Sequence, residues 1–219
     1  MALWVFGYGS LIWKAGFHYD EHLVGFVKEY RRVFYQGSTD HRGTPEFPGR
    51  TVTLEPAKEE IYQWGAAYKI TNKEDQLTAL EYLEVREKQY DEKAYVDFFT
   101  EPTASVPAVS DVLVYIASAD KKLNMNYLGP ASLEEMALYE KQLSLQHVIN
   151  RTRSLFGFSY CLRLLCRQII KAQGPSGPNR DYLFKLENAL FVQIGFEDKH
   201  VTDLANEVRR VLLQGESAV

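Results

Sequence analysis

The N-terminal stretch 4–13 reads Trp-Val-Phe-Gly-Tyr-Gly-Ser-Leu-Ile-Trp, an apolar and aromatic run broken by two glycines and a serine. Its start predicts a buried strand over Leu3–Phe6. Gly7 and Gly9 can adopt a positive φ and have no side chain, so the backbone can approach a ligand closely there, and Ser10 adds a hydroxyl. A bulge or tight turn that serves the fold alone explains the pattern equally well. The chain therefore begins with a strand that ends in a binding loop or a structural turn.

Five further segments have the composition of strands, since they are rich in β-branched and aromatic residues. The glycines and prolines within Gln36–Arg50 predict a loop between two of them. Inside that loop, the polar run Ser38–Gly43 is a candidate site lining, and a solvated loop is the equal alternative. The succession of strands favours a curved antiparallel sheet or a partial barrel. The predicted strands are Leu23–Tyr35, Arg50–Leu54, Tyr62–Tyr68, Val96–Phe99 and Asp111–Ala117.

A helix is predicted over Lys73–Tyr90, where apolar residues recur every three or four positions. Glu87 lies four residues after Leu83, so at about 100° per residue it projects close to the apolar face. A carboxylate that points inward must be paired, hydrogen-bonded or used in chemistry, because desolvation raises its pKa. Glu87 is therefore a candidate catalytic base. The alternatives are an ion pair with Arg86, Lys88 or a basic residue from elsewhere, or a solvated last turn. The expected apolar face consists of Leu77, Leu80, Leu83 and Val85.

The last part of the chain is predicted to be helical. One helix is expected to begin at Ala131 with Ser132 as its cap. After a rigid turn at Gly174–Asn179, two more helices are predicted over Arg180–Leu190 and Thr202–Leu213.

The composition limits the kinds of partner. The chain has 219 residues, 46% of them hydrophobic, which is enough for one sizeable core and predicts a single domain over 1–219. A net charge of −4 with scattered basic residues argues against nucleic acid or an anionic membrane. Cys161 and Cys166 are too few for a disulfide framework or a structural zinc site, and no targeting segment precedes the first strand. We therefore expect a cytoplasmic protein.

Several common motifs are excluded. Ile12 occupies the position where a dinucleotide fingerprint needs its third glycine, and Ser10 lacks the flanking glycine of a nucleophile elbow. The turn Gly174–Asn179 lacks the Lys-Ser/Thr of a phosphate loop. His18 and His22 have the spacing of a ligand pair but lie in a polar, loop-like region, so we expect them at the surface. The sequence thus calls for no nucleotide, serine-nucleophile or metal chemistry.

Six sequence blocks carry a family resemblance. They are Trp4–Trp13, Gln36–Gly43, Pro48–Leu54, Val85–Tyr90, Asn126–Pro130 and Gly174–Asn179. Together they strongly resemble the ChaC-type γ-glutamylcyclotransferases, and most closely the plant glutathione-specific branch. Any one block is weak evidence, whereas six in the family's order along nearly the whole chain are highly specific.

The resemblance implies a fold, a reaction and site residues. The implied fold is a single α+β domain in which helices flank a small mixed, partly closed β-barrel. The implied reaction converts glutathione to 5-oxoproline and cysteinylglycine, with Glu87 as the catalytic residue and Tyr127 closing the other side of the site. The γ-glutamyl-binding loop maps to Val5, Phe6, Gly7, Tyr8, Gly9 and Ser10.

In the implied reaction, the substrate's α-amine attacks its own γ-amide carbonyl and expels the cysteinyl amine. One glutamate can take a proton from the attacking amine and return a proton to the departing nitrogen, so no cofactor is required and the sequence gives no support for a divalent ion. Two alternatives remain. A related enzyme would act on other γ-glutamyl amines or dipeptides, and a non-enzymatic protein would only bind γ-glutamyl groups. The intact Arg86–Glu87 pair argues against the second, because a binding protein needs no base.

The interval 138–167 departs from the family pattern. In the family, the helix containing Leu133–Ala137 continues directly into a stretch like the one that begins at Gln168. Joining Ala137 to Gln168 restores one apolar face, because Ile170 then falls seven residues after Leu133. The interval is too interrupted by charge to span a membrane. We interpret 138–167 as an atypical insertion, from an isoform or a translated intron, that forms a helical excursion or a disordered loop.

Overall fold

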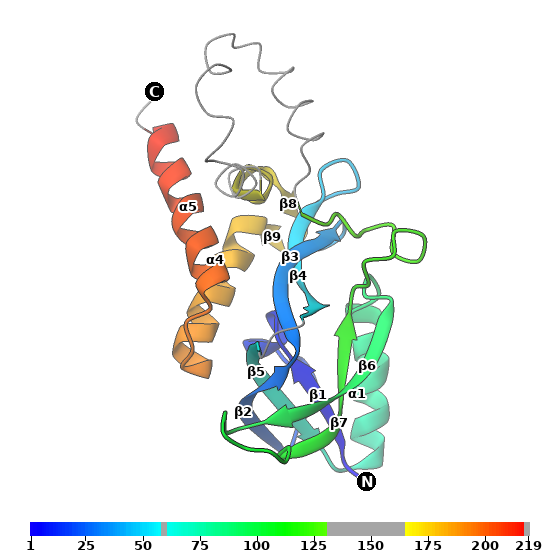
Figure 1. Cartoon of the computed structure of the whole chain (residues 1–219). Helices are drawn as coiled ribbons and strands as arrows, with labels where there is room; N and C mark the ends of the chain where they lie inside the picture. Colours follow the sequence, from blue (N-terminus) through cyan, green and yellow to red (C-terminus); the bar gives the residue numbers. More distant parts are fainter. Residues whose placement is uncertain (58–60, 131–164, 217–219) are drawn as a thin grey trace.

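The computed structural model describes residues 1–57, 61–130 and 165–216 (Figure 1). Five strands form a closed barrel in which β1 runs antiparallel to β5 and parallel to β7. The predicted mixed barrel is therefore confirmed, and within the described residues its closure is complete. In barrel order the strands are β1 (Leu3–Gly7), β5 (Tyr62–Ile70), β2 (Glu21–Lys28), β6 (Glu92–Phe99) and β7 (Val109–Ile116).

A two-stranded antiparallel ribbon, β3 (Tyr30–Ser38) with β4 (Gly49–Pro56), stands on the barrel. The sequence predicted a longer strand region over Leu23–Tyr35, and the structure divides it into the two strands β2 and β3. Glu29 has a φ of 63°, a left-handed conformation that ends β2 and redirects the chain into β3. The ribbon extends from the barrel toward α4 (Figure 1).

The helix α1 (Lys73–Arg86) begins at Asn72, whose side chain accepts a hydrogen bond from the Glu74 amide. It ends four residues before the predicted Tyr90, because Glu87 leaves the helical conformation at φ −99° and ψ 20°. The predicted apolar face is wrong at two positions. Leu77 and Val85 are 63% and 73% exposed. The buried positions are Ala79 and Leu83, spaced one turn apart.

The C-terminal helices form a layer on the side of the barrel and ribbon away from α1 (Figure 1). The two predicted helices are confirmed, with a π-helical turn after the first and a small hairpin before it. The elements are β8 (Gln173–Gly174), β9 (Gly177–Pro178), α4 (Asn179–Ala189), η2 (Leu190–Ile194) and α5 (Lys199–Glu216).

The main core lies between the barrel, the ribbon and this helical layer. Residues 165–171 are helical, and Leu165, Cys166 and Ile169 are buried in that core. The last residues of the predicted insertion thus belong to the domain. The rest of that interval, Cys161 and the predicted helix start at Ser132 lie outside the described residues. No helix in the described part of the chain is long and apolar enough to cross a membrane.

Candidate active site

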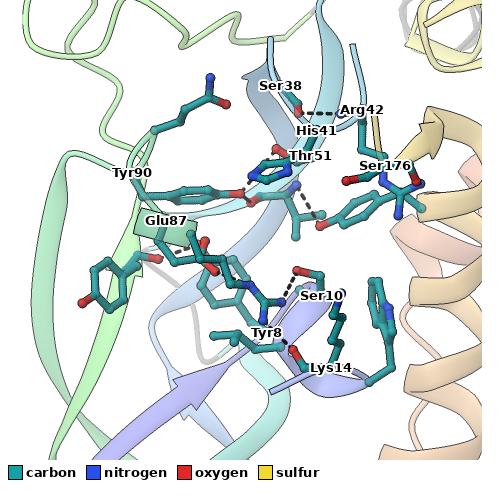
Figure 2. Close-up of a pocket in the computed structure, with 18 of the residues that line it drawn as sticks. Tyr8, Ser10, Lys14, Ser38, His41, Arg42, Thr51, Glu87, Tyr90 and Ser176 are labelled. Carbon is teal, nitrogen blue, oxygen red and sulfur yellow. Dashed lines mark hydrogen bonds and ion pairs between the residues drawn. The ribbon is translucent and has the colours of Figure 1, made fainter. Parts of the chain in front are cut away.

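A cavity of about 560 Å³ opens where the end of β1, the ribbon, the end of α1 and the start of α4 meet (Figure 2). Five of the six blocks that carry the family resemblance contribute lining residues, although they are spread over the chain from Phe6 to Ser176. The block Asn126–Pro130 contributes none among the described residues. The fold therefore gathers most of the distinctive sequence into one place.

The predicted binding loop divides into two parts. Phe6, Tyr8, Gly9 and Ser10 line the cavity, whereas Val5 and Gly7 do not. The Val5 side chain is fully buried in a smaller core cluster. The loop ends in a short 3-10 turn, η1 (Ser10–Ile12).

The two glycines of the loop are needed for space. Both lie outside the positive-φ region, contrary to one of the two reasons predicted for them. A Cβ on Gly7 would lie 2.7 Å from the Leu11 Cβ. A Cβ on Gly9 would lie 3.0 Å from Val52 Cγ2 and 3.1 Å from the Tyr182 hydroxyl. Of the two reasons that the sequence suggested for these glycines, the structure supports the need for a residue without a side chain.

Glu87 lies at the C-cap of α1, where its amide donates to the Leu83 carbonyl at 2.8 Å. Its side chain lines the cavity and is only 13% exposed. Burial raises the pKa of this carboxyl above its ordinary value, and the neighbouring Arg86 guanidinium partly opposes the rise. The helix end thus presents an inward carboxylate, as the sequence predicted.

Arg86 connects this carboxylate to the loop. Its Nε lies 3.1 Å from Glu87 Oε1, and its Nη2 donates to Ser10 Oγ at 2.8 Å. Its Nη1 donates to the carbonyls of Lys14 and Ala15 at 2.6 and 2.9 Å. The ion pair, one of the alternatives for Glu87, is therefore present and coexists with a position in the cavity.

Two tyrosines, one buried and one partly buried, line the cavity with Glu87. Tyr8 donates to the Tyr115 carbonyl at 2.7 Å, and Tyr90 donates to the Val52 carbonyl at 2.8 Å. Burial, together with the charge of Glu87, raises the pKa of both phenols well above the ordinary value. Both phenols keep their protons near pH 7, and Glu87 is the one carboxyl group of the cavity among the described residues (Figure 2).

The polar loop over Ser38–Gly43 lines the cavity through Ser38, His41 and Arg42, as the sequence suggested. Arg42 Nη1 donates to the Ser176 carbonyl at 2.6 Å and so ties this loop to the turn between β8 and β9. The cavity is rich in cations. Lys14, Arg42, Arg86 and Lys185 line it, whereas Glu87 is its one carboxylate among the described residues.

Tyr127 lies elsewhere. It is 7% exposed, and its hydroxyl donates to the Glu55 carboxylate on β4. Its backbone forms an isolated bridge with Gln36 on β3. It does not line the cavity, so the predicted closing of the site by Tyr127 finds no counterpart in this geometry.

Sequence reasoning missed several lining residues: Lys14, Tyr82, Tyr115, Tyr182 and Lys185. Tyr82 lies four residues before Arg86, so its helical spacing could have identified it. Nothing local marks Tyr182, which reaches the site through a helix more than ninety residues beyond Glu87. Among the residues that the structure describes, no three His, Cys, Asp or Glu side chains group as a metal site, and His18 and His22 are exposed.

Known proteins match along nearly the whole chain. The family model described as ChaC-like protein matches residues 3–144 and 139–211. Gamma-glutamylcyclotransferase 2-3 of Arabidopsis thaliana is 61% identical, covering 99% of this chain and 93% of that protein. Glutathione-specific gamma-glutamylcyclotransferase 1 of Danio rerio is 38% identical, covering 88% and 91%.

A solved structure agrees in fold. The crystal structure of a gamma-glutamyl cyclotransferase specific to glutathione from yeast has a TM-score of 0.71 and 27% identity. The match covers 95% of this chain and 96% of that one.

Proposed function

The chain belongs to the ChaC-like γ-glutamylcyclotransferases, and we propose that it converts glutathione to 5-oxoproline and cysteinylglycine, with Glu87 as the catalytic base. The observation that carries the proposal is the position of Glu87. This one carboxyl group, whose pKa is raised by burial, lines the same cavity as the glycine-containing loop after β1. A general base works best when its pKa lies near the operating pH, and burial moves Glu87 in that direction.

The proton balance of the reaction needs only one such group. The substrate's α-ammonium gives a proton to the Glu87 carboxylate, and the neutral amine attacks the γ-carbonyl carbon. The new C–N bond closes a five-membered lactam as the bond to the cysteinyl nitrogen breaks. The protons lost by the attacking nitrogen are those gained by the departing nitrogen, so no water or other reactant is consumed.

The shape of the cavity supplies the larger part of the rate. The reaction is intramolecular, and for well-oriented groups proximity contributes on the order of 7–11 kcal/mol, whereas general acid–base help gives about 10²–10⁴-fold. We propose that Phe6, Tyr8, Gly9 and Ser10 hold the γ-glutamyl group curled against Glu87. Val5 and Gly7 shape this loop from behind.

The charges of the cavity favour glutathione. This substrate carries two carboxylates and one ammonium near pH 7, and the cavity presents four cations around one carboxylate. Lys14 lies near Ser10, whereas Arg42 and Lys185 lie on the side of Ser176 and α4, so the two ends of a tripeptide meet separate cations. We place the reaction in the cytoplasm, because two cysteines without a disulfide framework suit a reducing compartment.

Assay of the purified protein tests the proposal. We expect release of 5-oxoproline from glutathione, with much lower kcat/KM for γ-glutamylcysteine and γ-glutamyl-lysine, and the same rate after treatment with EDTA. Faster turnover of a γ-glutamyl amine other than glutathione would instead support the alternative, a related enzyme that acts on other γ-glutamyl amines or dipeptides. Loss of activity in EDTA that Mg²⁺ or Mn²⁺ restores would establish a metal requirement.

A further inference from the structure

Tyr8, Tyr90 and Tyr182 line the cavity, and their hydroxyl groups differ in one respect. Tyr8 and Tyr90 each donate their hydroxyl proton to a backbone carbonyl. Tyr182 only accepts, from the Val52 amide at 3.5 Å, and its O–H donates to no group in the described ranges 1–57, 61–130 and 165–216. A buried donor without an acceptor costs free energy, so an uncommitted hydroxyl in a binding cavity is suited to an acceptor on the ligand.

The Tyr182 hydroxyl is held at the binding loop. It lies 3.1 Å from the point that a Cβ on Gly9 would occupy, and the side chain is 4% exposed. Trp13 packs edge-on at 5.7 Å between ring centroids, and Phe34 packs edge-on at 6.4 Å. These contacts fix the ring, so the hydroxyl meets a substrate without reorganising.

The phenol is a neutral donor. Burial and the charge of Glu87 raise the pKa of Tyr182, which keeps its proton in place near pH 7. A substrate carboxylate carries its full charge before reaction and has the cations of the cavity available to it. The γ-carbonyl oxygen gains negative charge only as the ring closes, and preorganised neutral donors act on such an oxygen.

We propose that the Tyr182 hydroxyl donates a hydrogen bond to the γ-carbonyl oxygen of the substrate and stabilises the oxyanion that forms there. This inference rests on the proposed function. As the α-nitrogen bonds to the γ-carbon, the π pair of the carbonyl moves to the oxygen beside Tyr182. The pair returns as the bond to the cysteinyl nitrogen breaks, and Glu87 delivers the proton that this nitrogen needs. Tyr182 keeps its own proton throughout and is a second catalytic residue.

The variant Tyr182→Phe tests the assignment, because it removes one oxygen and keeps the packed ring. Loss of an oxyanion donor costs about 10²–10³-fold in kcat, and we expect a loss of that size, with KM for glutathione within about twofold of the parent. The acidic limb of the pH–rate profile, set by Glu87, is expected to stay in place. Tyr62→Phe is the matched control, since Tyr62 is a half-buried barrel tyrosine outside the cavity.

The other results overturn the assignment. Unchanged kcat would do so, and so would a raised KM with normal kcat, since the hydroxyl would then act in ground-state binding. The parent is assayed in parallel, so failure of the proposed function, in which the parent releases no 5-oxoproline, is distinct. Should Tyr182→Phe not fold by circular dichroism, 3-fluorotyrosine and 3,5-difluorotyrosine at position 182 replace it. We expect kcat to change progressively as the phenol becomes more acidic, and an identical kcat in both would refute the proposal.

Discussion

Arg86 donates from Nη2 to Ser10 Oγ at 2.8 Å, across 76 positions of the chain, while its Nε lies 3.1 Å from Glu87 Oε1. One planar guanidinium thus joins the end of α1 to the loop after β1. Charge-assisted hydrogen bonds of this kind are shorter and stronger than neutral ones. A single side chain therefore links the proposed base directly to the proposed binding loop.

Replacing Arg86 by Met should displace the acidic limb of the kcat/KM profile. The guanidinium lowers the pKa of Glu87 against the effect of burial, so its removal raises that pKa further. Because the base works deprotonated, the acidic limb moves to higher pH. Hydrogen bonds to charged groups contribute about 1.5–3 kcal/mol, so kcat/KM at neutral pH should fall roughly 10- to 100-fold.

The control for this prediction is Lys88→Met. Lys88 is also a cation next to Glu87, but it pairs with Asp40 at 2.8 Å and is 57% exposed. The acidic limb should stay in place in this variant. An Arg86→Met profile that overlays the parent's would show that the pair does not set the working pKa.

Glu87→Gln should bind glutathione and lose turnover. General acid–base catalysis contributes about 10²–10⁴-fold, and we expect kcat to fall by at least that range, with the dissociation constant from calorimetry nearly unchanged. Glu81→Gln, an exposed change on the same helix, should behave as the parent. Near-normal turnover by Glu87→Gln would refute the assignment of the base.

Glu87→Gln should also be more stable than the parent at pH 7. The pKa of Glu87 is raised in the folded state, so the folded protein holds that proton more tightly than the unfolded chain. Ionisation of this group therefore costs stability as pH rises from the unfolded pKa through the folded one. The midpoints of thermal unfolding should differ at pH 7 and converge at acid pH, where the carboxyl is protonated in both states.

The barrel strands and the inward direction of Glu87 could be predicted because they depend on local periodicity. The alternation of residue types within Tyr62–Tyr68 predicts a strand whatever that strand packs against. Glu87 follows Leu83 by four residues, about one helical turn, so the two side chains point the same way. The face of α1 could not be predicted to the residue. Ala79 is buried although it is small, and Leu77 is exposed although it is large, because the surface on which α1 packs decides the face.

The remaining site residues depend on contacts between distant segments. Tyr182 reaches Gly9 only because α4 packs against β4 and η1, and no pattern near Tyr182 encodes that contact. The break at Glu29 is likewise tertiary, since the ribbon must leave the barrel there. Tyr127 shows the reverse case. A position carried over from the family resemblance alone proves to bond Glu55.

Gly9→Ala should impair the site more than the fold. The added Cβ would meet Val52 Cγ2 at 3.0 Å and the Tyr182 hydroxyl at 3.1 Å, both within the cavity wall. Overpacking costs about 1–3 kcal/mol, so kcat/KM should fall roughly 5- to 140-fold. Gly7→Ala is the comparison, because Gly7 does not line the cavity and its added Cβ would lie 2.7 Å from the Leu11 Cβ. Thermal unfolding should show the larger loss of stability in Gly7→Ala. A larger loss in Gly9→Ala would contradict the view that Gly9 serves the site and Gly7 the fold.

Deleting residues 138–164 should leave a folded, active enzyme, because Glu87, the loop around Gly9 and Tyr182 all lie outside that interval. The shortened chain joins Ala137 to Leu165 and keeps the three buried side chains of the helical stretch 165–171, which are Leu165, Cys166 and Ile169. Activity with glutathione and the unfolding midpoint are the measurements. A chain that does not fold would show that the interval is an integral part of the domain.

The longer deletion, 138–167, is the matched comparison. It removes Leu165 and Cys166 from the core and brings Glu135 to the helical position that Leu165 occupies, three residues before Gln168. Loss of a buried leucine costs about 2–5 kcal/mol, so this variant should be clearly less stable than the shorter deletion. Equal stability of the two deletion variants would indicate that the insertion ends at residue 167, so that the family's continuous helix resumes at Gln168.

Asp198→Ala should destabilise the fold by about 3–5 kcal/mol, because it leaves the buried charge of Arg32 without its partner. Arg32 Nη1 lies 2.5 Å from Asp198 Oδ2, and the Arg32 side chain is fully buried. The same carboxylate accepts from the His200 and Val201 amides at 3.1 and 3.2 Å, at the start of α5. Denaturant unfolding measures the loss.

The Arg32–Asp198 pair also contacts the active site, since Arg32 Nε donates to the carbonyl of the cavity residue Tyr8 at 2.8 Å. Arg32 Nη2 donates to the Trp64 carbonyl at 2.6 Å. The variant Arg32→Met/Asp198→Ala removes both charges, so it should recover part of the stability that Asp198→Ala loses. It should not recover kcat/KM, because Arg32→Met also removes the hydrogen-bond donor to the Tyr8 carbonyl, which helps to hold the binding loop. Recovery of activity in step with stability would mean that the pair acts on the loop only through the fold.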